Sequence, residues 1–335
     1  MPQSNLSMQG VQSVPCAWSE LFIIGGKIPS RRAYHVSFVW NNEYYVHGGQ
    51  DLKEGAFGDL WKLNIDFLYP HKEEATDAAE IDGATWQQVP IKGKFPPKLA
   101  HHQGVLQEFS KEFIIYGGIR GVESSDTIYV VDLKTFTFNA ILAAQQKEVN
   151  GKALPGPRDD HTMITFSVEQ PRTKPAYMIG GFKNGSKMND IYKLNQAGQV
   201  FTWELVEVAG PKPEPRSSFS ACLSTDTTFY LFGGSGDNNA KYNDLWHFNG
   251  TAWVLLTPNS PLEDTESLTG DQQPMHKSGH QIALYKNRHI LVFGGIHEVT
   301  YEMNDFKTYD TQSKAWRTID EENKNASESG SPKNK

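Results

Sequence analysis

The sequence predicts an all-β protein assembled from five copies of one four-stranded unit. Three observations predict this fold class. A short apolar run that ends in a Gly-Gly doublet occurs five times along the 335 residues. An Asp that opens a second apolar run follows each doublet, and an aromatic residue that opens a further short run follows each Asp. A pattern that recurs at intervals of tens of residues is the signature of a repeat architecture.

The first strand of each unit is preceded by a basic residue and by a His or an aromatic residue. Because the His is present in every unit but one, we expect it to serve the fold rather than a reaction. The basic and ring residues are Arg31 and Arg32 with His35, Lys98 with His101 or His102, Arg158 with His161, Arg216 with Phe219, and Lys277 with His280.

The second strand of each unit ends at the doublet. Each run is too short for a helix and is rich in aromatic and β-branched residues, which predicts a buried strand. Glycine adopts positive φ and lets two backbones approach closely, so the doublets are expected where the units crowd around an axis. The five runs are Tyr44–Gly49, Phe113–Gly118, Tyr177–Gly181, Phe229–Gly234 and Ile290–Gly295.

The third strand begins at the repeated Asp, and the fourth opens with the aromatic residue. A buried Trp or Phe removes on the order of 150–250 Å² from water, so these rings are expected between neighbouring units. The third strands are Asp59–Leu63, Asp126–Val130, Asp190–Leu194, Asp244–Phe248 and Asp305–Tyr309, and the aromatic residues are Trp86, Phe138, Trp203, Trp253 and Trp316.

The order of basic residue, His, Gly-Gly, Asp and Trp resembles the kelch repeat. The resemblance covers residues 18–319 and implies a β-propeller of four-stranded blades, an architecture in which radial repetition protects the sheet edges. We expect residues 1–17 to be an N-terminal extension. Residues 320–335 are polar and lack an apolar anchor, so we expect them to be a disordered tail.

The first blade is preceded by a stretch that does not fit five complete units. Gly25-Gly26, followed by Pro29 and Arg31, matches the segment after Trp203, so this doublet is interpreted as a connector between blades. Residues 18–24 are expected to form an outermost strand beside the last unit. Because the last unit already has Trp316, the ring has either five blades and a spare strand or six positions with one incomplete.

The composition excludes several function classes. A net charge of −7 and a pI near 5.9 argue against general nucleic-acid binding, which needs a basic surface. No apolar run approaches the roughly 20 residues that cross a bilayer, and the N-terminus lacks the pattern of a signal peptide. Cys16 and Cys222 offer neither a disulfide framework nor metal-ligand spacing. We therefore expect a cytoplasmic protein that binds neither nucleic acid nor membrane.

The repeated basic residue is placed at the start of the innermost strand, so the resemblance puts a ring of cations around one mouth of the central channel. Such a ring could bind carboxylates, Arg by bidentate pairing. The alternative, in which each Arg bonds to backbone or to an Asp and serves only the fold, stays open. The predicted partner-binding residues are Arg31, Arg32, Lys53, Lys98, Arg120, Arg158, Lys183, Arg216, Lys277 and His297.

The resemblance implies a protein-interaction module or scaffold without a cofactor, whose partner is another protein with an acidic or C-terminal peptide segment. One alternative is a ubiquitin-ligase substrate receptor that acts with a separate adaptor. A second is a metal-dependent kelch enzyme, either a copper oxidase that needs a suitably placed Cys or an iron-dependent specifier protein. His297, Glu298 and Asp305 are the nearest approach to the iron cluster. No nucleophile triad, phosphate loop or zinc spacing is found.

Overall fold

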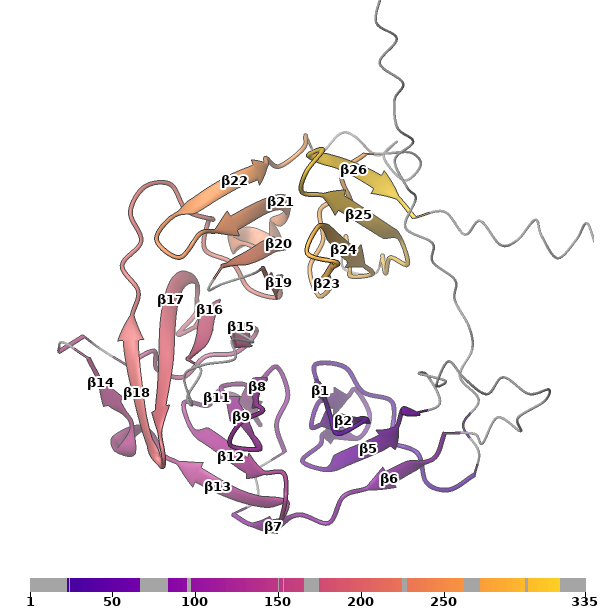
Figure 1. The fold of residues 1–335 in the computed structure, drawn as a ribbon, viewed down its shortest axis with the longest axis vertical. Helices are drawn as coiled ribbons and strands as arrows, with labels where there is room; N and C mark the ends of the chain where they lie inside the picture. The colour runs from indigo at the N-terminus through magenta and orange to yellow at the C-terminus, as the bar shows by residue number, and fades with distance from the viewer. Residues whose placement is uncertain are drawn as a thin grey trace, which may run out of the picture.

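Five four-stranded antiparallel sheets stand around a common axis as the blades of a propeller (Figure 1). Each blade contributes its first strand to the centre and its fourth to the periphery. The computed structural model describes residue 23 and residues 25–66, 84–94, 98–149, 151–152, 154–165, 175–224, 228–261, 272–298 and 301–319.

The strands of the blades follow one another from the axis outward. The first blade has β1 (Val36–Trp40), β2 (Glu43–His47), β5 (Leu60–Asn64) and β6 (Trp86–Gln88). The second has β8 (Gln103–Gln107), β9 (Glu112–Tyr116), β12 (Ile128–Asp132) and β13 (Thr137–Ile141). The third has β15 (Thr162–Thr165), β16 (Ala176–Lys183), β17 (Ser186–Ala197) and β18 (Val200–Leu205). The fourth has β19 (Ser220–Leu223), β20 (Phe229–Ser235), β21 (Lys241–Phe248) and β22 (Trp253–Thr257). The fifth has β23 (Gln281–Tyr285), β24 (His289–Phe293), β25 (Phe306–Asp310) and β26 (Ala315–Thr318).

Short elements form in the loops and connectors of the blades. Two hairpins link second and third strands: β3 (Gln50–Asp51) with β4 (Gly55–Ala56), and β10 (Ile119–Arg120) with β11 (Glu123–Ser124). Two connectors add a parallel strand at the periphery, β7 (Lys92–Gly93) on β13 and β14 (Lys147–Glu148) on β18. The described residues also include two single-turn 3₁₀ helices, η2 (Ala143–Gln145) and η3 (Asp237–Asn239).

The glycine doublets lie where the sequence predicts them, at the end of the second strand of each blade. In the third and fourth blades the pairing of second and third strands resumes beyond the doublet, after register shifts at Ile179/Gly181 and Phe232/Gly234. Both glycines of every doublet have positive φ, the region that glycine enters at least cost.

The hydrophobic core lies between blades rather than within one sheet. Trp203, Trp253 and Trp316 are buried at these interfaces, as expected. Trp86 is only half-buried, so the prediction of a buried ring is wrong for the first blade. The buried rings pack against the preceding blade, as Trp316 does on Phe232 and Trp203 on Tyr116.

The predicted N-terminal strand is corrected at its one described residue. Ile23 forms a parallel bridge with Ala84, at the periphery of the first blade rather than beside the last unit. Ala209 makes the same kind of bridge with Ala252 of the fourth blade. Gly25-Gly26 is therefore part of a connector, as predicted. Residues 1–22, with Trp18 and Cys16, and residues 320–335 lie outside the described residues.

Replacing Trp203 by Ala is expected to reduce the free energy of unfolding by about 3–5 kcal/mol, as for other large-to-small core changes. Its side chain is 1% exposed, and its Nε1 donates a hydrogen bond to Gln146 Oε1 at 2.7 Å. Chemical denaturation followed by tryptophan fluorescence measures the loss. Phe109→Ala, at a side chain that is 67% exposed, is the control and should change stability by less than about 0.5 kcal/mol. Equal effects of both changes would contradict the assignment of β18 to an inter-blade interface.

Candidate functional site

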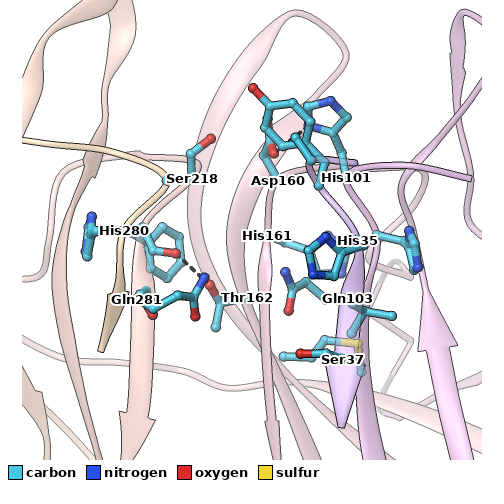
Figure 2. A pocket seen from close by; sticks show the side chains of 18 of the residues that line it. His35, Ser37, His101, Gln103, Asp160, His161, Thr162, Ser218, His280 and Gln281 are labelled. Carbon is cyan, nitrogen blue, oxygen red and sulfur yellow. Dashed lines mark hydrogen bonds and ion pairs between the residues drawn. The ribbon is translucent and has the colours of Figure 1, made fainter. Parts of the chain in front are cut away.

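The innermost strands enclose a cavity of about 710 Å³ along the axis. Equivalent positions of the five blades line it, because the repeat places the same residue of each first strand toward the axis. Figure 2 shows His101, Asp160 and Ser218 at one end of this channel, above Gln103, Thr162 and Gln281. This end opens on the face that carries the inter-blade connectors, which is called the connector face below.

The mouth of the channel is framed by the residue that precedes the repeated His or Phe. All five of these residues adopt left-handed φ angles between 50° and 69°. In the second to fifth blades, the backbone N–H of this residue donates to the C=O of the equivalent residue in the preceding blade, over 2.8–3.1 Å. This chain of hydrogen bonds joins Tyr34, His101, Asp160, Ser218 and Gly279.

Three side chains of this frame form a polar cluster. The rings of Tyr34 and His101 stack with their centroids 3.7 Å apart. His101 Nδ1 lies 2.8 Å from Asp160 Oδ1, and its Nε2 lies 3.2 Å from Gln50 Nε2. Burial, with the Asp160 carboxylate nearby, raises the pKa of Tyr34, which keeps its hydroxyl protonated. Sequence reasoning missed this cluster, although its signal was present as the residue immediately before each repeated ring.

The repeated basic residues do not form an open ring, and this part of the site prediction is wrong. Arg32, Arg158, Arg216 and Lys277 have buried side chains. Each is paired with the repeated Asp of its own blade, namely Asp59, Asp190, Asp244 and Asp305, at 2.5–2.8 Å.

The three arginines also donate to the first carbonyl of the doublet. Arg216 Nη1 donates to Gly233 C=O at 2.9 Å, and Arg32 and Arg158 repeat the contact with Gly48 and Gly180 at 3.0 Å. Burial lowers the pKa of Lys277, although Asp305 opposes that shift. The repeated cation therefore serves the fold, which was the alternative left open by the sequence.

The second unit departs from the repeat. Leu99 occupies the position of the buried basic residue, because its C=O accepts from Gly49 N–H as Arg158 C=O accepts from Gly118 N–H. Lys98 is one residue earlier and exposed. The alignment that placed Lys98 beside the four buried cations was thus shifted by one residue.

Four of the predicted cations remain exposed on the connector face, and all of them belong to the loops and connectors of the first two blades. They are Arg31, Lys53, Lys98 and Arg120. Lys183 donates to Pro155 C=O at 2.6 Å, and His297 Nδ1 lies 2.6 Å from His276 C=O, so both are held by the backbone.

Two aliphatic side chains stand beside these cations. Leu52 and Val122, at the tips of the β3–β4 and β10–β11 hairpins, are 101% and 97% exposed. Sequence reasoning missed them, since it searched the loops after the doublets for charge only. An aliphatic residue at the tip of a polar hairpin is the signal that was available.

Cys222 is the cysteine among the described residues, and it is buried. Burial raises the pKa of the Cys222 thiol to about 12, which keeps it a poor nucleophile and metal ligand. Within the described ranges, no group of three His, Cys, Asp or Glu side chains is arranged to hold a metal ion. No helix in the same ranges is long and apolar enough to cross a membrane.

Comparison with known proteins identifies the repeat. The family described as the KLHDC2/KLHL20/DRC7 Kelch-repeats domain matches residues 168–333, which cover the third blade from β16 onward and all of the fourth and fifth blades. The same strand order and doublet positions extend to the first two blades. The chain is a kelch-repeat β-propeller.

Several relatives are similar over most of this kelch chain. Leucine-zipper-like transcriptional regulator 1 homolog of Drosophila melanogaster is 22% identical over 307 residues, which is 91% of this chain and 28% of that protein. Kelch domain-containing protein 1 of Mus musculus is 22% identical over 87% of this chain and 70% of its own length. The dynein alpha chain of the Chlamydomonas reinhardtii flagellar outer arm is 26% identical over 88% of this chain and 6% of its own length. The chain thus spans less than a third of the first of these proteins.

Removing one buried cation tests its structural role. Arg216→Ala leaves the buried Asp244 carboxylate without its counter-charge and the Gly233 carbonyl without its side-chain donor, so the free energy of unfolding should fall by about 3–5 kcal/mol. Urea denaturation measures the loss. Arg31→Ala is the control, because Arg31 is exposed, and it should change stability by less than about 0.5 kcal/mol. A stable Arg216→Ala protein that loses a partner would instead restore the cation-ring interpretation.

The buried histidines predict a dependence of stability on pH. Burial lowers the pKa of His47 to about 4 and that of His161 and His280 to about 3, whereas an unfolded His titrates near 6.5. The unfolded chain therefore binds more protons below pH 6.5, and stability falls as the pH drops from 6.5 toward 4. Each of the three should weaken folding by roughly 2 kcal/mol at pH 5.

Urea titrations between pH 7.5 and 4.5 measure this slope, and His161→Phe is the matched variant. Neither ring nitrogen of His161 has a hydrogen-bond partner, and Phe219 fills the same position in the fourth blade. The variant should be at least as stable at pH 7 and should show a flatter profile. An unchanged slope in His161→Phe would show that another group controls the acid transition.

Proposed function

We propose that this propeller binds another protein on the connector face, over the first and second blades. The observation that carries the proposal is the pair of fully exposed hairpin tips, Leu52 and Val122. Two fully exposed aliphatic side chains on neighbouring blades do not contribute to the stability of the fold. Contact with a partner would remove their apolar surface from water, which favours binding.

The surrounding charge supports a partner of acidic and aliphatic character. Lys53 adjoins Leu52, and Arg120 lies two positions before Val122. Arg31 and Lys98 belong to the connectors that lead into the same two blades and are also exposed. A peptide segment with alternating acidic and aliphatic side chains fits this surface, because exposed cations would steer it while the hairpin tips bury its apolar groups.

The channel mouth adds a polar floor between the two hairpins. Beside the His101 ring, whose two nitrogens contact Asp160 and Gln50, the Tyr34 hydroxyl and the Asp160 carboxylate present a donor and an acceptor. These groups can hydrogen-bond to the backbone or terminus of a bound segment. The proposal assigns no reaction to the chain.

A ubiquitin-ligase substrate receptor is the second candidate function. Such a receptor needs a further surface for its adaptor, and Phe109, 67% exposed in the turn between β8 and β9, stands on the face opposite the connectors. Co-purification of a cullin adaptor that is lost in Phe109→Asp and retained in Leu52→Asp would support this candidate. Absence of any adaptor from the purified complex would count against it.

Acidic substitution of both hairpin tips is expected to abolish capture of the physiological partner. Leu52→Asp combined with Val122→Asp should weaken binding at least tenfold in a quantitative pull-down, since it removes apolar contact and reverses the local charge. The melting temperature should stay within about 2 °C of the parent, because both side chains are exposed. Val200→Asp, at the exposed first residue of β18, is the matched control. Undiminished capture by the folded double variant would contradict the proposal.

A separate measurement tests the electrostatic part of the proposal. Partner affinity should fall as the ionic strength rises from 0.05 to about 0.5 M, because exposed charges are screened within about 10 Å at 0.1 M salt. Lys53→Glu with Arg120→Glu should weaken binding at low salt and flatten the dependence. A salt dependence that is the same in parent and variant would show that the cations do not face the partner.

A further inference from the structure

Successive blades are joined on the connector face by one repeated backbone hydrogen bond. The N–H of the second doublet glycine donates to the C=O at the buried-cation position of the next blade. The bond is made from Gly49 to Leu99, from Gly118 to Arg158, from Gly181 to Arg216 and from Gly234 to Lys277, at 2.8–3.0 Å. Among the described residues, the corresponding bond from Gly295 of the fifth blade to Arg32 of the first is not formed.

The frame of the channel mouth is interrupted at the same place. Four hydrogen bonds join its five residues in order from Tyr34 to Gly279. The bond that would close the circle, from Tyr34 N–H to Gly279 C=O, does not occur in the described part of the chain. Two independent sets of backbone hydrogen bonds are therefore complete at four junctions and open between the fifth and first blades, at what is called the seam below.

Side-chain packing changes at the seam as well. The residue before the doublet is at most 2% exposed in the first four blades, whereas Phe293 of the fifth is 39% exposed. Ala283 of β23 is exposed, whereas Cys222 at the equivalent position of the fourth blade is buried. On the other side, Ala33 is exposed, whereas its counterpart Ser278 is buried. Both sides of the seam thus carry the surfaces that elsewhere face another blade.

The arrangement of the blades agrees with this difference. In Figure 1 the blade of β23–β26 and the blade of β1–β6 stand farther apart than the other neighbours do, most of all at their outer strands β26 and β6. The half-buried Trp86 of β6 lies on the same side. Its counterparts in the other blades are covered by the blade that precedes them.

We infer that the seam is a docking site for a sixth kelch-type blade, supplied by polypeptide outside residues 1–335 of this chain. The four existing junctions specify the register of that blade. Its residue at the buried-cation position would accept a hydrogen bond from Gly295 N–H, and its own second doublet glycine would donate to Arg32 C=O. The residue of the docking blade at the channel mouth would adopt a left-handed φ, which favours Gly or Asn. Its N–H would donate to Gly279 C=O, and its C=O would accept from Tyr34 N–H.

The sequence indicates which strands the docking blade must bring. Trp18 stands five positions before Ile23, close to the six positions that separate Trp203 from the bridging Ala209. Trp18 therefore matches the outer-strand aromatic residue of a ring position that precedes the first blade, and the fifth blade already contains Trp316. The segments 1–22 and 320–335 contain no Gly-Gly doublet. The missing part is the three inner strands, with their doublet.

A fragment of this chain is a suitable probe, because each unit carries the same interface. Residues 213–248 contain Arg216, the doublet Gly233-Gly234 and Asp244, and end before Trp253. This fragment, fused to a solubility tag, is titrated into the full chain. Amide hydrogen exchange is measured by NMR at Tyr34 and Gly295. The amides of His101 and Gly234, which are hydrogen-bonded at closed junctions, are the matched controls.

In the free chain, Tyr34 and Gly295 amides should exchange at least a hundredfold faster than His101 and Gly234. Saturating fragment should protect both and raise the melting temperature by at least about 5 °C at a hundredfold excess over Kd. Ala283→Lys should weaken fragment binding at least tenfold, whereas Val254→Lys, at an exposed position of β22, should leave it unchanged.

Two results would overturn the inference. Protection of the Tyr34 and Gly295 amides in the free chain would show that the seam is already filled. If deletion of residues 1–22 then exposes the amides, that segment fills it. If protection depends on protein concentration, a second copy of the chain fills it. Fast exchange of both amides at saturating fragment, or no binding of the fragment, would show that the seam does not accept a kelch-type blade. Neither result bears on the partner surface at Leu52 and Val122, which belongs to the proposed function.

Discussion

In the first four blades, the first glycine of the doublet lies against the residues that lead into the first strand of the next blade, and the rest of the structure depends on that approach. A β-carbon on Gly48, Gly117, Gly180 or Gly233 would come within 2.5–2.9 Å of an atom of the following blade. Backbones this close leave no room for a side chain at the first doublet position. The positive φ of these residues is a second reason for glycine, because other residues are strained in that conformation. The blades can therefore converge on a channel, and the larger residues at their outer ends fill the widening space between them.

The crowding at the doublet explains why a cation is repeated next to it. The carbonyl of the first glycine is withdrawn from water and needs a donor, and so does the carboxylate of the repeated Asp. One guanidinium meets both needs, as Arg216 does for Gly233 and Asp244. Burying the pair is tolerable because the geometry is bidentate and every contact stays within one blade. A regular array of charge in a repeat protein is thus first a property of the repeat, and function is better sought where blades differ.

The repeat made the fold predictable, and the same regularity limited what could be said about the site. Doublet, Asp and Trp fixed strand order and register because each has a steric or packing role that recurs in every blade. The orientation of the cations was not predictable, since the same spacing serves an open ring or a buried pair. The Lys98/Leu99 shift shows the cost of aligning by charge alone, because the backbone contact of Leu99 with Gly49 defines the position. Leu52 and Val122 belong to hairpin tips that share no pattern between blades, so the repeat itself did not indicate their exposure.

A matched pair of glycine substitutions tests the central constraint most directly. Gly233→Ala and Gly294→Ala introduce the same methyl group at similar φ angles of 60° and 68°. At Gly233 that carbon would meet His280 Cε1 at 2.8 Å and Lys277 C=O at 2.9 Å of the next blade, whereas at Gly294 it would meet only Met303 C=O at 3.5 Å. Equilibrium unfolding should show a loss of about 1–2 kcal/mol for Gly294→Ala from backbone strain. Gly233→Ala should lose about 1–3 kcal/mol more, from overpacking. Equal losses would contradict the view that contact between the doublet and the next blade holds the propeller together.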